Sequence, residues 1–167
     1  MQTRIEHRLF DSLFAREYLG VLALARRVAG PAAAEDVTQE AFAALLRAGP
    51  ADPEHARRWL YRVAFHRALD AVKRTRLRRE RELHLVETAS PPEPPELIEQ
   101  RETRDAVRGA LRSLKPAYAA ALSLRHSGFA YKEIAAVLNV PVDRVGVMLI
   151  RAEAALKKEL SHVSPSR

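Results

Sequence analysis

Residues 128–160 read GFAYKEIAAVLNVPVDRVGVMLIRAEAALKKEL, and this stretch decides the fold of the C-terminal part of the chain. Apolar residues recur at the helical period from Tyr131 to Leu138. Asn139 can then end that helix in the left-handed region, and Pro141 suits the start of the next one. The pattern predicts a helix-turn-helix, a unit whose second helix is shaped to enter the major groove of DNA.

The two faces of the second helix differ in character. The apolar face consists of Val142, Val145, Leu149, Ala152, Leu156 and Leu160. The other face presents the candidate groove contacts Arg144, Val147, Met148 and Arg151. Tyr131 and Lys132, at the start of the shorter helix, complete the candidate set. An ordinary helical hairpin within a bundle would show the same pattern, so that alternative stays open.

The composition fits a helical protein that needs neither disulfides nor a metal. The chain has 167 residues, 47% of them hydrophobic, and no cysteine, which excludes disulfides and thiolate metal sites. Its six histidines are scattered, so neither a zinc site nor a histidine-based catalytic centre is expected. There is no apolar run of about 18 residues and no signal-peptide core, so we expect a soluble, cytoplasmic protein without membrane insertion and without a cofactor.

Charge divides the sequence into three parts. Residues 1–81 carry 16 basic and 10 acidic side chains, residues 82–102 carry 1 and 6, and residues 103–167 carry 11 and 5. The acidic part contains ETASPPEPPELIEQ, whose prolines do not fit a helix interior and which has little apolar surface to bury. We therefore expect an all-α chain with two small helical domains, 1–81 and 103–167, joined by an acidic, proline-rich linker at 82–102. A long loop within one domain is the alternative.

Three helices are expected in the N-terminal domain, at about 10–28, 33–48 and 53–81. Gly30 and Pro31 stop the first of them, and Asp52 is a suitable N-cap for the third. Glu35 and Asp36 would fall in the first turn of the second helix, where the helix dipole favours negative charge.

On a helical wheel, the residues of the third helix separate into distinct faces. One arc of roughly 80° carries Arg58, Arg62, His66, Leu69, Lys73 and Arg76. Tyr61 and Phe65 lie on its flank. Cations that follow phosphates, next to rings that stack on unpaired bases, are what binding of a single strand requires. The alternative is a solvated basic face with both rings half buried.

In their order along the chain, these segments resemble the bacterial RNA polymerase sigma factors of the extracytoplasmic-function group. The matching segments are AEDVTQEAF at 34–42, RRWLYRVAFHRALDAVKR at 57–74, and LRSLKPAYAAALSLRHSGFAYKEIA at 111–135 followed by the recognition helix. The ordered set is far more specific than any single motif. The resemblance implies a non-enzymatic factor whose partners are core RNA polymerase, promoter DNA and an anti-sigma protein that holds the free factor.

The resemblance implies that the segment at 34–42 docks on the clamp coiled coil of the polymerase. The polymerase contacts would be Asp36, Gln39, Glu40 and Phe42. Three polar groups and one ring on adjacent turns suit the rim and anchor of such an interface. Alternatively, Glu35 and Asp36 only stabilise the helix start, and Phe42 belongs to the core.

The segment at 57–74 corresponds to the part of these factors that opens the duplex and holds the minus-ten strand. The implied contacts are Arg58, Tyr61, Arg62, Phe65, His66 and Lys73. Relatives usually have Asn in place of His66, and an imidazole cannot make the paired contact of an amide, so we expect the downstream element to be read differently. We expect Asp70 to pair with Arg67 or Arg74 within the helix.

The recognition helix departs further from that family. Gly146, Val147 and Met148 stand where Lys, Ser and Arg are usual. Apolar side chains can meet thymine methyl groups but cannot satisfy guanine edges. Because only Arg144 and Arg151 remain to hold phosphates or read a base, we expect weaker or altered minus-thirty-five recognition.

Three other classes of protein are less consistent with the sequence. A stand-alone helix-turn-helix regulator is the alternative function, but residues 1–81 show neither a ligand-pocket signature nor a heptad seam. A purely structural module would leave the basic and aromatic face of residues 57–74 unexplained. An enzyme fits least, because no nucleophile and base pairing or phosphate-binding loop is present.

Overall fold

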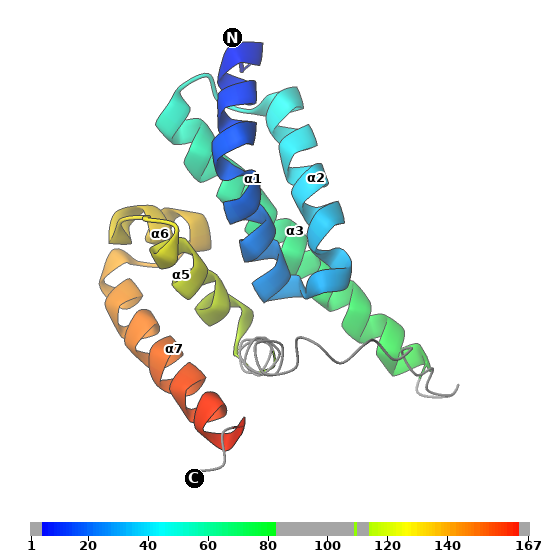
Figure 1. Cartoon of the computed structure of the whole chain (residues 1–167), viewed down its shortest axis with the longest axis vertical. Coiled ribbons are helices and arrows are strands. Elements are labelled where there is room, and N and C mark those ends of the chain that lie inside the picture. Colours follow the sequence, from blue (N-terminus) through cyan, green and yellow to red (C-terminus); the bar gives the residue numbers. More distant parts are fainter. Residues whose placement is uncertain (1–4, 83–108, 110–113, 164–167) are drawn as a thin grey trace, which may run out of the picture.

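The computed structural model describes residues 5–82, 109 and 114–163 (Figure 1). The helices are α1 (His7–Ala29), α2 (Pro31–Ala48), α3 (Pro53–Glu82), α5 (Pro116–His126), α6 (Tyr131–Leu138) and α7 (Val142–Val163). The predicted all-α class is confirmed, whereas the expected linker lies almost wholly outside the described residues. Of the helices described, none is both long and apolar enough to cross a membrane.

The helix ends follow from residues that the sequence singles out. Gly30 has φ 86° and its amide donates to the carbonyl of Arg26 at 3.0 Å, so α1 ends there and Pro31 begins α2. The Asp52 carboxylate accepts a hydrogen bond from the amide of His55 at 2.8 Å, which makes Asp52 the N-cap of α3. Asn139 adopts φ 54° and ends α6, as predicted.

One detail of the helix starts is different from the prediction. Helix α2 begins at Pro31, two residues earlier than expected, because proline is well suited to a first helical position. Glu35 and Asp36 therefore lie in the second turn, and the first turn holds no acidic residue. The predicted interaction of these two side chains with the helix dipole was wrong, since that effect falls off within the first turn.

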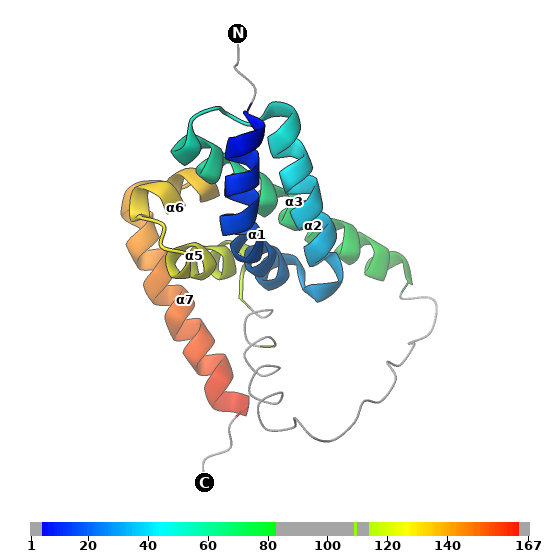
Figure 2. The ribbon, with the colours of Figure 1, turned by 45° about the horizontal axis from the view of Figure 1, so that its top comes forward.

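The helices form two units that pack on each other. Helices α1, α2 and α3 make an N-terminal unit, and residues 114–163, with α5, α6 and α7, make a C-terminal unit. Helix α5 lies beside α1, and α6 packs on α3 (Figures 1 and 2). A single cluster of buried apolar residues includes Leu24 and Tyr61 from one unit and Leu124 and Phe129 from the other. The two units thus share part of their hydrophobic core.

Candidate nucleic-acid interface

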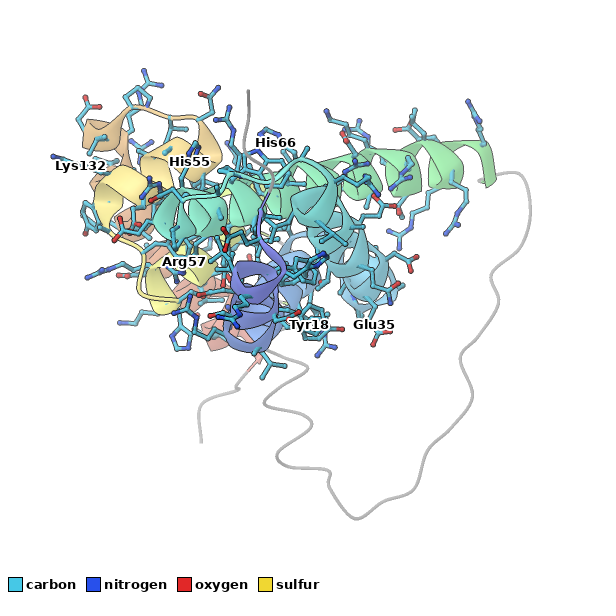
Figure 3. The ribbon with its side chains drawn as sticks, turned by 90° about the horizontal axis from the view of Figure 1, so that it is seen from above. Tyr18, Glu35, His55, Arg57, His66 and Lys132 are labelled. Atoms are coloured by element: carbon cyan, nitrogen blue, oxygen red, sulfur yellow. The ribbon has the colours of Figure 1, made fainter. Side chains whose placement is uncertain are left out.

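The basic face of α3 is open to solvent over most of its length. Arg62, His66 and Lys73 are exposed, and His66 lies along α3 on the side away from Glu35 (Figure 3). A groove of about 520 Å³ runs between α2 and α3, with Trp59 and His66 among its lining residues. The cations on its walls are Arg47, Arg62 and Arg67. A ring and several cations around one groove are suited to a base and its phosphate.

Tyr61 and Phe65, the two rings predicted to stack on bases, are buried in this structure, with 1% and 4% of their surface exposed. The Tyr61 ring meets the ring of Phe129 edge to face, with 4.7 Å between centroids. Its hydroxyl donates to Glu17 at 3.0 Å. Burial and this carboxylate raise the pKa of Tyr61, so the hydroxyl stays protonated. Base stacking by either ring remains a prediction, and it requires a change in this arrangement.

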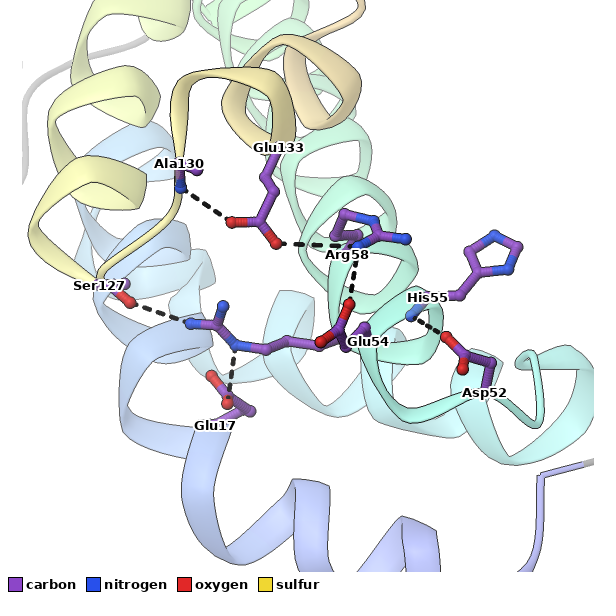
Figure 4. A network of polar contacts seen from close by, with 9 residues as sticks. Glu17, Asp52, Glu54, His55, Arg58, Ser127, Ala130 and Glu133 are labelled. Carbon is purple, nitrogen blue, oxygen red and sulfur yellow. Dashed lines mark hydrogen bonds and ion pairs between the residues drawn. The ribbon is translucent and has the colours of Figure 1, made fainter.

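Arg57 ties the two units together at the same place (Figure 4). Its Nε is 2.9 Å from a carboxylate oxygen of Glu17 on α1, and its Nη2 donates to the carbonyl of Ser127 at 2.9 Å. The guanidinium carbon lies 3.9 Å from the centroid of the Phe129 ring, which is a cation–π contact. No feature of the sequence marks Arg57 for this role, because its partners lie 40 and 70 residues away.

Arg58, a predicted DNA contact, forms ion pairs with two acidic residues. Its Nη1 lies 3.8 Å from a carboxylate oxygen of Glu54 and 3.8 Å from one of Glu133 on α6 (Figure 4). The other oxygen of Glu133 accepts a hydrogen bond from the amide of Ala130 at 2.8 Å. The Glu133 carboxylate thus supports the start of α6 and reaches the basic face of α3.

The predicted polymerase contacts on α2 divide into two kinds. Asp36, Gln39 and Glu40 are exposed, as an interface requires. Phe42 is 3% exposed and belongs to the core, with its ring centroid 5.0 Å from that of Phe14. The Phe42 side chain therefore cannot contact a partner directly in this structure, which favours the alternative that Phe42 belongs to the core.

The predicted pairing of Asp70 within α3 was wrong. Asp70 is exposed, and Arg67 instead reaches across to Glu40 on α2, with 3.2 Å between the charged atoms. Helix packing places the Glu40 carboxylate within reach of Arg67, and this tertiary contact cannot be read from i,i+4 spacing.

The recognition helix α7 presents an outer face that is close to the prediction. Arg144 and Arg151 are exposed, and Val147 is 48% exposed. Tyr131 and Lys132 at the start of α6 are exposed as well.

Three other positions of α7 are placed differently from the prediction. Met148 is half-buried and packs against the core, at the flank of the outer face. Val142, which the apolar stripe had placed inside, is 45% exposed because it lies at the first position of the helix. Ile150 is 68% exposed on the outer face, and the sequence reasoning missed it. Ile150 falls on the outward side of the helical wheel, and an apolar side chain there could have indicated a contact surface.

Within the described ranges, no group of three or more His, Asp or Glu side chains is arranged to hold a metal ion.

Comparison with known proteins gives consistent matches. Residues 13–78 match Sigma-70 region 2, and residues 104–156 match Sigma-70 region 4. The chain is similar to CnrH in its complex with the cytosolic domain of CnrY, with a TM-score of 0.66 and 25% identity over 95% of this chain and 92% of that one. It shares its fold with the sigma factor RpoE bound to the anti-sigma factor NepR from Bartonella quintana, with a TM-score of 0.63 and 19% identity over 91% and 96% of the two chains. No curated protein sequence matches the chain significantly.

Proposed function

Because the chain belongs to the extracytoplasmic-function group of sigma factors, we propose that it directs core RNA polymerase to specific promoters by binding two separate elements of the DNA. Sigma factors are not enzymes, and the polymerase performs the chemistry. The observation that carries the proposal is the match of Sigma-70 regions 2 and 4, in that order, to two helical units that each expose cations. Tagged chain mixed with purified core polymerase should elute with it from a sizing column. Elution of the chain alone would contradict the proposal.

Helix α2 is the proposed docking site for the polymerase. Asp36, Gln39 and Glu40 are exposed together on adjacent turns, so their polar groups can be satisfied by a partner helix. Phe42 supports this surface from beneath, because its ring packs against Phe10 and Phe14 of α1 and thereby holds α2 in place. We therefore assign Phe42 to positioning of the docking helix.

The groove between α2 and α3 is the proposed site for unpaired bases of the downstream element. Arg62 and Lys73 can follow phosphates, and Trp59 and His66 offer planar groups at the groove wall. Tyr61 and Phe65 can join them only after the surface that covers Tyr61 has moved away. We therefore expect unpaired bases to contact the groove first and the buried rings of Tyr61 and Phe65 later.

The upstream element is the proposed ligand of α7. Arg144 and Arg151 are placed to hold phosphates, since both are exposed on the same side of α7, one turn before and one turn after Val147. Between them, Val147 and Ile150 form an apolar centre that suits the methyl groups of thymine in the major groove. Ile150 therefore takes the role of apolar base contact that the sequence predicted for Met148.

Removal of the flanking cations should lower the salt dependence of upstream binding. Each lost phosphate contact should reduce the slope of log K against log salt by about 1, so Arg144→Ala and Arg151→Ala should each show that loss. The measurement is fluorescence anisotropy of holoenzyme on upstream duplex at several salt concentrations. Arg16→Ala, at an exposed cation of α1, is the matched control. Unchanged slopes in both test variants would exclude these phosphate contacts.

The apolar pair Val147 and Ile150 predicts that binding of the upstream element depends on single thymine methyl groups. Replacing a contacted thymine by deoxyuridine removes one methyl, which should weaken binding by about 0.8 kcal/mol, roughly fourfold. The joint variant Val147→Ala and Ile150→Ala should lose this sensitivity while still binding the duplex. Equal sensitivity in the variant and the unaltered chain would mean that another part of the protein meets the methyl groups.

An anti-sigma protein is the proposed regulator of the free factor. The two similar solved structures are described as complexes, one with the cytosolic domain of CnrY and one with the anti-sigma factor NepR. The likeness extends over more than nine-tenths of this chain in both cases, so both of its units have counterparts in proteins that were solved with such a partner. We place the protein in the cytoplasm, where polymerase and promoter DNA are found.

A further inference from the structure

Gly146 is a glycine inside the recognition helix that neither the backbone nor the packing of the chain requires. It lies within α7 and, unlike Gly30 and Gly128, does not have a positive φ. A side-chain carbon at Gly146 would lie 3.7 Å from a ring carbon of Tyr131, which is an ordinary contact distance. Glycine in a helix interior is less stable than alanine. Because the fold gains nothing from this glycine, we looked for another molecule that approaches the backbone there.

Two exposed apolar side chains flank Gly146. Tyr131, the first residue of α6, is 44% exposed, and Val142, four residues before Gly146 on α7, is 45% exposed. Residues four apart lie on the same side of a helix, so Val142 and Gly146 are neighbours on the surface. We call Tyr131, Val142 and Gly146 the glycine patch. On the outer face of α7 the patch continues into Ile150, four residues after Gly146.

The Tyr131 ring is held in place from its own side of the patch. The guanidinium carbon of Arg125 on α5 lies 5.6 Å from the centroid of the ring, which is a cation–π contact. The start of α6 is fixed as well, because the Glu133 carboxylate accepts a hydrogen bond from the amide of Ala130. The ring therefore stays beside Gly146 and leaves room there for one methyl-sized group.

The charges around the patch favour a base over a phosphate. Asp143 and Glu153 are exposed, three residues before and seven residues after Gly146, so both lie on its side of α7. Arg144 and Arg151 lie towards the other side of the outer face. Phosphates are attracted to the arginine side and repelled by the carboxylates, which leaves the glycine side to the base edges. Of the four bases, only thymine presents a methyl group in the major groove.

We propose that the glycine patch receives the methyl group of one thymine in the upstream element, so that Gly146 and Tyr131 determine which base is accepted at that position. The inference rests on the proposed function, because it takes the outer face of α7 as the surface that enters the groove. It adds a second methyl contact beside that of Val147 and Ile150. It also makes Arg125 a positioning residue for the Tyr131 ring.

Moving a methyl group from the DNA to the protein tests this contact. Upstream duplexes in which each thymine in turn is replaced by deoxyuridine are titrated with holoenzyme and followed by fluorescence anisotropy. At one thymine, loss of the methyl should weaken binding by the unaltered chain about fourfold, also when Val147 and Ile150 are replaced by alanine. Gly146→Ala should weaken binding of the unmodified duplex about tenfold, because an added methyl overfills a fitted contact. Deoxyuridine at the same position should restore most of that loss.

Thermal unfolding separates a role in DNA contact from a role in the fold. Gly146→Ala should raise the unfolding temperature by about 2–4 °C, because alanine favours a helix and the added carbon fits beside Tyr131. Ser161→Ala, at an exposed position near the end of α7, also favours the helix and is the matched control. We expect Ser161→Ala to bind every duplex as the unaltered chain does.

Variants of Tyr131 and Arg125 test the ring that flanks Gly146. Both side chains are exposed, so the fold should tolerate their replacement. Tyr131→Phe keeps the ring and should keep the preference for thymine over deoxyuridine, whereas Tyr131→Ala should lose it. Arg125→Gln should reduce the preference, and Arg125→Lys, which retains a cation over the ring, should restore most of it. The same titration measures all four variants.

The outcomes separate the inference from the function on which it rests. A Gly146→Ala variant that prefers thymine at every position as strongly as the unaltered chain does would overturn the inference. Equal weakening of all duplexes would overturn it too, because the contact would then be with the sugar–phosphate backbone. A lower unfolding temperature of Gly146→Ala would overturn its premise, since the fold itself would require the glycine. Failure of the proposed function would appear differently, as a chain that forms no holoenzyme with core polymerase.

Discussion

Reversing the charge of Asp36 and Glu40 to lysine should weaken binding to core polymerase about tenfold or more. Both carboxylates are exposed on one surface of α2, and a like charge placed at a complementary interface is repelled and loses its hydrogen bonds. The fold should tolerate the change, because the Glu40–Arg67 pair is nearly half exposed on both sides and surface pairs contribute about 0–1 kcal/mol. Fluorescence titration of labelled chain with core polymerase measures the effect.

A matched control distinguishes a docking surface from a general effect of charge. Asp11→Lys on α1 and Glu153→Lys on α7 together make the same change in net charge at exposed positions away from α2. We expect this control to bind polymerase as the unaltered chain does. Similar losses in both double variants would show that overall charge, and not the α2 surface, governs the association.

Replacing Tyr61 by alanine should lower the free energy of unfolding by about 3–5 kcal/mol, the range for a large buried ring. The ring is fully buried against Phe129, and its hydroxyl is paired with Glu17. Tyr61→Phe keeps the ring and should cost only about 1 kcal/mol, because Glu17 retains its pairing with Arg57. Urea unfolding followed by circular dichroism measures both values.

The Tyr61 result also determines how DNA experiments on this helix are to be designed. A loss below about 1 kcal/mol in Tyr61→Ala would mean that the ring is not held in the core, and its packing against Phe129 would be wrong. If the large loss is found, alanine at Tyr61 or Phe65 reports on folding as well as on DNA. His66→Ala is then the better probe of the groove, since His66 is exposed.

Local patterns in the sequence were sufficient for the helices and for most of the outer face of α7. Gly30, Asp52 and Asn139 act through bonds to near neighbours in the chain, so their roles could be predicted. Arg144, Val147 and Arg151 follow from helical periodicity alone. These features depend on residues within one or two turns of each other, and a single sequence contains them completely.

The burial of the α3 rings could not be predicted in the same way. Tyr61 and Phe65 lie at the border between the apolar and basic faces of α3, and a wheel alone does not say which side is covered. The partner of Tyr61 is Phe129, which comes from the other unit across the expected linker. The roles of Arg57 and Glu133 likewise depend on the packing of α6 on α3, which periodicity does not specify.

Run-off transcription on a library of promoter fragments is the decisive test of whether this chain directs core polymerase to specific promoters. Core polymerase and the chain are mixed with linear fragments, and the transcript ends are sequenced. We expect defined start sites that appear only when the chain is present and that share two spaced elements upstream. Transcripts with the same starts with and without the chain would contradict the assignment of promoter-directing function to this protein.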